Sequence, residues 1–210
     1  MNILVIDGQG GQLGGQLIKS LKSNFKEIYI TAVGTNAIAT ATMLKAGANQ
    51  AATGENPVVV ACRKADVIIG PIGIVIADAL YGEITPKMAV AVGQSDAVRI
   101  LLPVNKCSNL IAGVSDVNMT TIIDDAISKV KDLVKTDNLK TKLDDWDNTF
   151  KLIKEDRVPK VNDMISEVDF LIDRRDYKNA IKKIAEIEIE ISTLKRKSDI
   201  DRELESMKQK

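Results

Sequence analysis

The chain contains no histidine, which removes the side chain that most often serves as a general base and as a ligand of transition metals. Its two cysteines, Cys62 and Cys107, stand far apart in apolar-rich segments, a pattern that supports neither a disulfide framework nor a zinc site. Basic and acidic residues both number 29, so no net charge attracts nucleic acid or an anionic membrane. No apolar run approaches the ~18 residues of a membrane span. We therefore expect a cytoplasmic protein with no metal, nucleic-acid or membrane partner.

Glycine is also absent from the second part of the chain. All 13 glycines lie between Gly8 and Gly113, and Pro159 is the one proline after Val134. Such a change in composition marks two architectures. The sequence predicts an α/β domain at residues 1–134, a linker at 135–139 and a helical part at 140–210.

Short β-branched runs alternate with helix-like segments in the first part. Their nearly continuous hydrophobicity suits strands covered on both faces, and the helix-sized spacing between them favours right-handed parallel crossovers. Thr85 and Pro86 mark the start of one helix, since threonine suits an N-cap and proline the first helical position. We expect a Rossmann-like, doubly wound parallel sheet. Its candidate strands are 2–7, 28–33, 67–69, 99–104 and 110–114, and an amphipathic helix at 119–134 closes the domain.

The second part carries apolar residues at helical spacing in two long stretches. The polar segment 173–180 between them suits a tight reversal, and Pro159 should bend or divide the first helix. The pattern predicts an antiparallel helical hairpin, a short coiled coil that serves self-association or docking to another protein through residues 140–210. The apolar positions include Leu143, Trp146, Phe150, Ile153, Val161, Ile165, Val168 and Leu171, followed by Tyr177, Ile181, Ile184, Ile187, Ile191 and Leu194.

The stretch ILVIDGQGGQLGGQLIKSL, residues 3–21, is typical of a strand, a glycine-rich turn and a helix. Gly8 allows the sharp turn, and Gly14 lets the helix close on the strand. Gly10 and Gly11 let backbone amides approach an anion, and the helix N-terminus adds free N–H groups and a positive dipole end. The turn is a candidate phosphate site; the alternative is a tightly packed corner without a ligand.

The residues after the second predicted strand argue against an ordinary dinucleotide site. Thr35 and Asn36 stand where an Asp or Glu would bind the adenosine ribose, and no Arg is present for a 2′-phosphate. None of the three tyrosines has a lysine four residues later, so the Tyr-Lys pair of short-chain reductases is absent, and the turn is no P-loop. Asn36 can still hydrogen-bond a ribose. The cofactor stays open, with NAD(P) or another nucleotide as candidates.

Polar residues gather at or beside the ends of other predicted strands. In an open parallel sheet these ends share one edge, where ligands bind. We therefore expect a polar crevice that holds a phosphorylated small molecule. Its segments are VGTN (33–36), TGEN (53–56), GPIG (70–73) and PVNKC (103–107), and the candidate cofactor-binding residues are Gly8, Gly10, Gly11, Gly14, Thr35, Asn36, Gly70, Gly73 and Asn105.

Two functions are compatible with such a crevice, and whether the protein is an enzyme stays open. An enzyme would use Glu55 as acid or base and Lys106 as phosphate partner near Asn105. A ligand-dependent binding or adaptor protein needs only the turn and the crevice, and the missing histidine and ribose carboxylate favour it. Both acids can instead be structural, since Asp7 and Glu55 can cap helices. Further candidates for chemistry are Asp78, Glu83 and Cys107, and Cys107 can equally be a small buried hydrophobe.

Several long segments in order resemble the bacterial proteins grouped as domain of unknown function 3842, seen mostly in Firmicutes. These are MNILVIDGQGG, AVGTNAIAT, MLKAGA, ATGENPVVV, CRKADVIIGPIGIVIADALYGEITPKMAVAVGQSDA and RILLPVNKC, which together span about residues 1–134. The resemblance implies a Rossmann-like domain with a polar crevice. It implies no activity and no catalytic residue.

Residues 143–194 depart from that family and are similar to a helical repeat of the septation ring formation regulators (EzrA). The resemblance is carried by Trp146, the Val158-Pro159 step and the turn from Tyr177 to Ala180. The membrane anchor of those regulators is missing, so the resemblance implies helical structure here and no division role.

Overall fold

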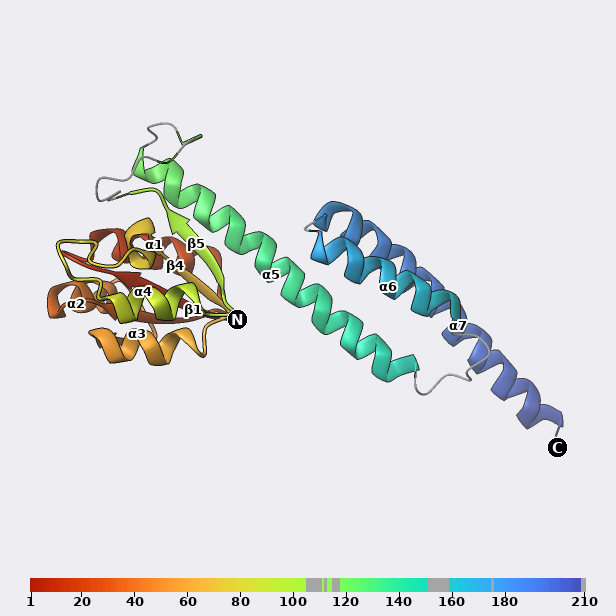
Figure 1. The fold of residues 1–210 in the computed structure, drawn as a ribbon. Coiled ribbons are helices and arrows are strands. Elements are labelled where there is room, and N and C mark those ends of the chain that lie inside the picture. The colour runs from red at the N-terminus through yellow and green to blue at the C-terminus, as the bar shows by residue number, and fades with distance from the viewer. Residues whose placement is uncertain (105–110, 112, 115–117, 151–158, 175, 209–210) are drawn as a thin grey trace. The chain divides into compact units, whose positions relative to one another are not determined.

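The computed structural model describes residues 1–104, 111, 113–114, 118–150, 159–174 and 176–208, which form two compact units, Met1–Lys131 and Asp132–Lys210 (Figure 1). The first unit holds all the strands, and the second is helical. The elements are β1 (Asn2–Asp7), α1 (Gln12–Asn24), β2 (Tyr29–Gly34), α2 (Ala37–Lys45), β3 (Gln50–Thr53), α3 (Glu55–Cys62), β4 (Val67–Pro71), the 3₁₀ helix η1 (Ile72–Val75), α4 (Pro86–Gly93), β5 (Val98–Leu102), α5 (Met119–Phe150), α6 (Pro159–Asp173) and α7 (Tyr177–Lys208).

The first unit is an α/β domain with a five-stranded sheet in the order β3-β2-β1-β4-β5, and every neighbouring pair is parallel. This confirms the predicted Rossmann-like parallel sheet. Four predicted strands correspond to β1, β2, β4 and β5, with boundaries that differ by at most two residues. The fifth candidate, 110–114, falls partly outside the described residues, and its described members are not in a strand.

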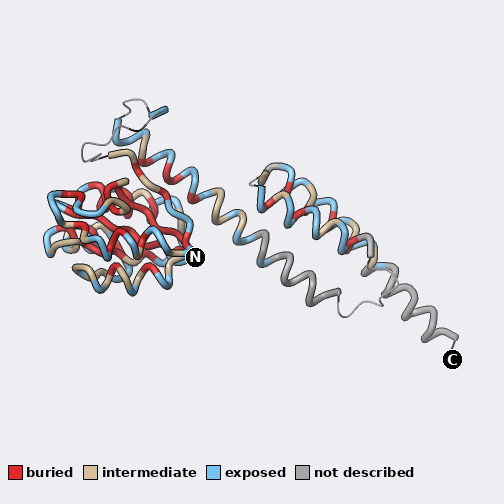
Figure 2. Tube along the Cα trace, in the orientation of Figure 1, coloured by how far each residue is buried: buried red, intermediate tan, exposed pale blue. Residues whose placement is uncertain are grey.

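Helices cover both faces of the sheet, which explains why its central strands are apolar along their whole length. α1 packs with α2, and α3 packs with α4, as right-handed crossovers on opposite faces require (Figure 1). Residues Ile3–Ile6 of β1 and Val67–Ile69 of β4 are no more than 1% exposed. Figure 2 shows the buried residues running along these strands at the centre of the domain. Strands buried on both faces cannot alternate apolar and polar residues.

The sequence did not predict β3, because Gln50–Thr53 (QAAT) contains one β-branched residue and no large apolar one. Tertiary contacts impose the strand instead. The Asn49 side-chain oxygen accepts hydrogen bonds from the backbone N–H of Ile30 at 2.9 Å and from Lys22 Nζ at 2.7 Å. These bonds fix the chain beside β2 just before the edge strand begins.

In the second unit α6 and α7 pack against each other, as Figure 1 shows. Glu167 and Lys183 form an ion pair between the two helices at 2.6 Å. Pro159 is the first residue of α6, the position where proline costs a helix nothing. A coiled-coil geometry for this pair stays a prediction. The buried seam consists of Val161, Val168, Ile172, Ala180, Ile184, Ile187 and Ile191.

Residues 135–139, which the composition predicted as a linker, lie within α5. Met119–Phe150 contains neither glycine nor proline, so nothing in its backbone chemistry interrupts a helix. These residues are therefore helical, and their role as a linker stays a prediction. Within the described ranges, no helix has the length and apolar character needed to cross a membrane.

Candidate functional site

The candidate site lies at the carboxyl edge of the sheet, where the strand order reverses. From β1 the chain builds outward through β2 to β3, and then returns to the other side of β1 to form β4 and β5. In open parallel sheets ligands bind outside the strand ends at this reversal. Here the reversal lies between β1 and β4, beside the glycine-rich turn that follows β1.

The glycines of this turn are required mainly by close packing. Gly11 is the N-cap of α1 with φ 67°, and a Cβ atom there would lie 2.6 Å from Ala39 Cα in α2. A Cβ at Gly14 would lie 2.5 Å from Met43 Sδ and 3.0 Å from Asp7 Cβ. Gly10 differs, because the atom nearest to its Cβ position is 4.0 Å away and the residue is exposed. Of the four predicted turn glycines, Gly10 is the one with room for a ligand.

Asp7, at the end of β1, caps α1 with a buried carboxylate. Its Oδ1 accepts from the Gly8 N–H at 2.8 Å and its Oδ2 from the Gly14 N–H at 2.7 Å. The side chain is 3% exposed, and burial raises the pKa of Asp7, although the Gly14 and Gly8 hydrogen bonds oppose this rise. Asp7 thus takes amides that a phosphate would otherwise use. The exposed residues Gly10 and Gln12 remain, and the first N–H groups of a helix have no partner inside it.

Thr35 and Asn36 join the turn after β2 to the turn after β1. The Thr35 N–H donates to the Asp7 carbonyl at 3.0 Å, and Asn36 Nδ2 donates to the Gln9 carbonyl at 2.9 Å. Asn36 Oδ1 also accepts from the Ala39 N–H at 2.9 Å and so caps α2. Both predicted residues therefore lie beside the glycine turn.

Glu83, from the segment before α4, places a carboxylate between these two turns. Its Oε2 accepts from the Gln9 N–H at 2.7 Å, from the Thr35 hydroxyl, and from Asn36 Nδ2 at 3.2 Å. Burial would raise the pKa of Glu83, but the hydrogen bonds from Thr35, Gln9 and Asn36 hold it below its ordinary value. A Cβ at Gly8 would lie 2.6 Å from Oε2, so Gly8 is small because this carboxylate packs on it.

Sequence reasoning included Glu83 among several acids but gave it no specific role. It follows Thr35 by 48 positions, so no local spacing links the two residues. The available signal was indirect: an acid was missing after β2, and an unassigned acid stood in another segment of the same edge. Only the three-dimensional structure shows that Glu83 lies beside the residues that follow β2.

The segment that carries Glu83 has an unusual backbone. Asp78, Leu80 and Tyr81 have positive φ angles of 61°, 54° and 59°, and Gly82 follows at 84°. Hydrogen bonds close the turn, including Asp78 N–H to the Ile84 carbonyl at 2.8 Å. Left-handed non-glycine residues cost about 1–2 kcal/mol each and persist where the surroundings fix them. Buried Leu80 and Ile84 provide that fixation, while Tyr81 is 98% exposed.

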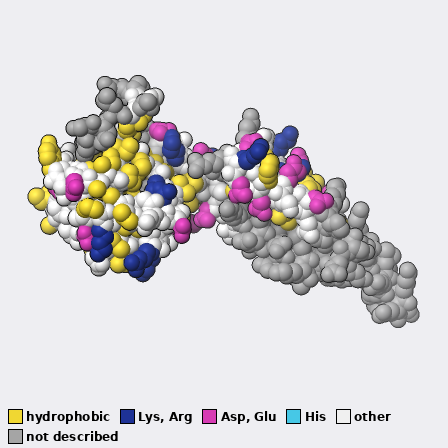
Figure 3. Space-filling view, in the orientation of Figure 1, with side chains coloured by type: hydrophobic (Ala, Val, Ile, Leu, Met, Phe, Trp, Pro, Cys, Tyr) yellow, Lys and Arg dark blue, Asp and Glu magenta, His cyan; other side chains and the backbone are white. Residues whose placement is uncertain are grey.

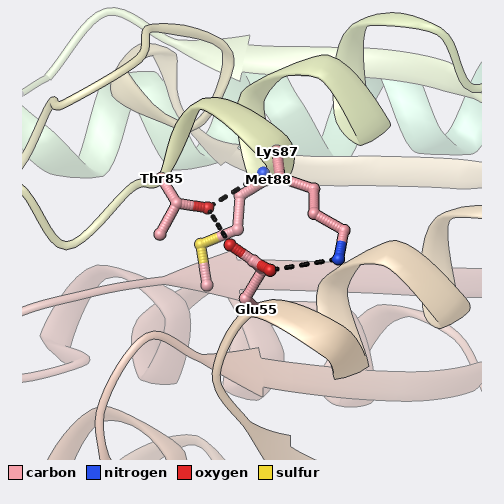
Figure 4. A network of polar contacts seen from close by, with 4 residues as sticks. All are labelled: Glu55, Thr85, Lys87 and Met88. Atoms are coloured by element: carbon pink, nitrogen blue, oxygen red, sulfur yellow. Dashed lines mark hydrogen bonds and ion pairs between the residues drawn. The ribbon is translucent and has the colours of Figure 1, made fainter.

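Glu55, the sequence's candidate acid or base, connects α3 to α4 (Figure 4). Its Oε2 accepts from the Thr85 hydroxyl at 2.7 Å and its Oε1 lies 3.2 Å from Lys87 Nζ. Thr85 in turn caps α4 by accepting from the Met88 N–H at 3.2 Å. The Thr85 and Lys87 contacts lower the pKa of Glu55. The carboxylate is thus held in a link between helices, whereas the structural role considered from the sequence was a helix cap.

The remaining candidates are packed or lie outside the described residues. Gly70, at the end of β4, would bring a Cβ against the Ile6 carbonyl, and Gly73 is buried in η1 beside Ala79 and Leu80. Asn105, Lys106 and Cys107 fall outside the described residues. Cys62 is a core residue, and its burial raises the pKa of the thiol to about 11.

The surface chemistry of the described residues does not single out a metal or a polyanion. Basic and acidic side chains are interspersed over the face shown in Figure 3. No cluster of three or more His, Cys, Asp and Glu residues is placed to hold a metal ion in the part of the chain that the structure describes. Among the described residues, the turns after β1 and β2 therefore offer backbone amides, the Thr35 hydroxyl, the Asn36 amide and the Asp7 and Glu83 carboxylates.

Comparison with known proteins gives one match. A family described as "Domain of unknown function (DUF3842)" matches residues 2–135. No curated protein and no solved structure matches the chain. The family match confirms the resemblance of the first part and ends before residues 143–194, so the resemblance of those residues to the septation ring formation regulators stays a prediction.

Proposed function

The chain belongs to the domain of unknown function family DUF3842, and because that description assigns no activity, we propose from the geometry that its α/β domain binds a nucleotide or another phosphorylated small molecule. The phosphate lies against Gly10 and the N-terminus of α1. The proposal includes a cytoplasmic location, as the composition predicted.

The observation that carries this proposal is the open approach to Gly10 at the point where the strand order reverses. Ala39, Met43 and Glu83 occupy the space beside the other turn glycines, whereas Gly10 is exposed and, among the described residues, has only Gln12 within 4 Å of its Cβ position. The first turn of α1 carries no acidic residue, so the positive end of its dipole faces the ligand unopposed from within the helix.

The test is a thermal-shift and mass-spectrometry screen with a matched pair of variants. Wild-type protein is denatured to identify any co-purified nucleotide and is then titrated with NAD, NADP, ATP, GTP and FAD. Gly10→Asp adds a negative charge at the phosphate position, and Gly10→Asn adds nearly the same volume without charge. We expect Gly10→Asp to weaken binding roughly tenfold or more relative to Gly10→Asn, since two charges about 4 Å apart near a surface interact by about 4 kcal/mol.

Gly10 suits this test because a side chain there meets open space and its φ is not positive, so both variants should fold. No stabilisation of the wild type by any probe, with no nucleotide released on denaturation, contradicts the proposal. Equal binding by both variants also contradicts it, because the phosphate would then lie elsewhere.

The alternative function is an NAD(P)-linked or other nucleotide-dependent enzyme. Among the described residues no observation favours it over binding, since Glu55 is held by Thr85 and Lys87. Turnover of NADH by the purified protein in the presence of candidate carbonyl compounds would establish it.

We also propose that the pair of α6 and α7, as a coiled coil, mediates self-association or docking to another protein. Phe170 and Ile189 support this, because these large apolar side chains are 55% and 68% exposed, outside the buried seam of the pair. The double variant Phe170→Ser, Ile189→Ser in the full chain is compared with Val90→Ser, which changes a 52% exposed apolar residue of the first unit. A fall in mass by light scattering for the double variant alone supports self-association, and a wild-type monomer excludes it.

A further inference from the structure

We infer that Glu83 supplies the carboxylate that binds the ribose hydroxyls of the nucleotide, so that the site selects ribonucleotides with an unmodified 2′-hydroxyl. The inference rests on the proposed nucleotide binding. In Rossmann-like sheets an acid directly after β2 ordinarily binds the ribose. Here we assign that role to Glu83, which lies in a different segment.

The position of the carboxylate is the first argument. Thr35 and Asn36 occupy the two positions after β2, and neither is an acid. Glu83 Oε2 accepts hydrogen bonds from both of these side chains, so the carboxylate lies where the missing acid would be. The same oxygen accepts from the Gln9 N–H at 2.7 Å, immediately before Gly10 in the turn. A ribose bound by Glu83 is thereby adjacent to the proposed phosphate position.

One oxygen of the Glu83 carboxylate is available to accept hydrogen bonds from a ligand. All three hydrogen bonds reach Oε2, and Oε1 of Glu83 accepts none from the residues that the structure describes. A carboxylate oxygen offers two lone pairs, and a hydroxyl is a good donor to it. The 2′- and 3′-hydroxyls of a ribose present two such donors. Glu83 is half-buried, so the protein holds one oxygen and leaves the other for a ligand.

The backbone of the Glu83 segment is the third argument. Three non-glycine residues between Asp78 and Tyr81 adopt left-handed conformations, which cost free energy that a plain connection between β4 and α4 would avoid. The last residues of this segment are nevertheless held by hydrogen bonds of two side chains, those of Glu83 and Thr85. Glu83 bonds the turns after β1 and β2, and Thr85 bonds Glu55 at the start of α3. We infer that this strained backbone is kept because it holds the Glu83 carboxylate at the carboxyl ends of the strands.

Charge extends the selectivity to the 2′-phosphate. Glu83 and the buried Asp7 both border the site, and burial first and the nearby Glu83 carboxylate second raise the pKa of Asp7. A phosphate on the 2′-oxygen would face the Glu83 carboxylate directly. The site therefore prefers NAD to NADP as well as ATP to 2′-deoxyATP.

The test measures affinities of the full chain by isothermal titration calorimetry for two pairs of probes, ATP with 2′-deoxyATP and NAD with NADP. We expect the wild type to prefer the first member of each pair by roughly tenfold or more, the ratio typical of a lost hydrogen bond to a charged group. Glu83→Gln replaces the charged acceptor by a neutral one, so it should lose the preference for NAD over NADP and show a reduced preference for ATP over 2′-deoxyATP. Glu55→Gln changes another carboxylate of the same edge and should keep the preference.

The outcomes distinguish the role of Glu83 from the proposed binding of a nucleotide. Binding of all probes without discrimination by the wild type overturns the role of Glu83 and leaves nucleotide binding intact. Discrimination that is as large in Glu83→Gln as in the wild type, for both pairs of probes, overturns it too. If no probe binds the wild type, the proposed function fails and the inference fails with it. The wild-type comparison needs no variant, so the inference is testable even if Glu83→Gln folds poorly.

Discussion

The Glu83 carboxylate accepts a hydrogen bond from the backbone N–H of Gln9 at 2.7 Å, although 74 positions separate the two residues in the chain. The bond joins the turn after β1 to the segment before α4, on opposite sides of the strand reversal. Glu83 is thus part of the edge where we propose that the ligand binds. The edge can therefore be probed by stability as well as by binding.

Replacement of Glu83 by Gln should reduce the free energy of unfolding at pH 7 by about 1 kcal/mol, because hydrogen bonds to a charged acceptor become bonds to a neutral one. The pKa of Glu83 is below its ordinary value of 4.5 in the folded protein. Its contribution is then fully present above pH 4.5 and is lost as the pH falls through the lower, folded pKa. Urea denaturation at pH 7 and pH 3 should show the difference between wild type and variant shrinking with acidification.

The contribution of Asp7 to stability has the opposite pH dependence to that of Glu83. Burial raises the pKa of Asp7, so its stabilising contribution declines as the pH rises. Because the Glu83 carboxylate adds to the rise in the pKa of Asp7 that burial causes, the comparison of Glu83→Gln with wild type at each pH includes this smaller effect on Asp7. Glu27→Gln, at an exposed position without a described contact, is the control and should match the wild type in stability at pH 7. A constant difference between Glu83→Gln and wild type from pH 7 to pH 3 would contradict the assignment of charge to Glu83.

Replacement of Thr85 by Val should destabilise the protein by about 1–2 kcal/mol, the usual cost of removing a helix N-cap. The variant loses the acceptor for the Met88 N–H and the donor to Glu55, both shown in Figure 4. Thr85→Ser keeps the hydroxyl and should remain within about 0.5 kcal/mol of wild type. Chemical denaturation of the two variants measures the difference, and equal stabilities would show that the hydroxyl contributes nothing.

Gly14→Ala should destabilise by about 1–3 kcal/mol, the range for overpacking a close contact. The new methyl group would lie 2.5 Å from Met43 Sδ, and Met43 is fully buried and cannot swing into solvent. Gly93→Ala is the matched control, because no atom of the described residues lies within 4 Å of its Cβ position at the end of α4. That variant should gain up to about 1 kcal/mol from helix propensity. If both changes had the same sign, close packing at Gly14 would not be the cause.

Tyr81→Gly should stabilise the protein by about 1 kcal/mol, since glycine adopts a φ near 59° without the steric cost that tyrosine carries. The ring is 98% exposed, so little packing is lost. Tyr81→Ala removes the same ring but keeps a Cβ and should not gain stability. Thermal denaturation of both variants separates backbone strain from loss of the ring, and a destabilised glycine variant would mean that the ring has contacts of its own.

The apolar runs of the sequence were sufficient to predict four strands, because strands covered on both faces must be apolar along their length. They were insufficient for β3, whose position depends on Asn49 bonding to Ile30 rather than on its own residues. Composition also suggested a linker at 135–139, where α5 in fact continues. Both differences arise in segments whose own residues have little preference for one secondary structure, so that contacts with the rest of the fold decide it.

Prediction of the site shows the same division. The glycine turn and its neighbours Thr35 and Asn36 were identified from local spacing, and the structure brings them together. The pairing of Asp7 with Gly14 follows from the position of Asp7 at the end of β1, where a helix cap was one of the stated alternatives. The contact of Glu83 with Thr35 spans 48 positions and depends on the path of the chain between β4 and α4, which no short pattern encodes.

The central place of β1 in the sheet has a consequence for synthesis on the ribosome. β1 pairs with β2 on one side and with β4 on the other, and β4 begins at Val67. One edge of this apolar strand thus stays unpaired while some sixty further residues are translated. Such an edge is a target for chaperones and for pairing between nascent chains. The polar Asn2 at its start and the buried Asp7 at its end are the two features of the strand that oppose such mispairing.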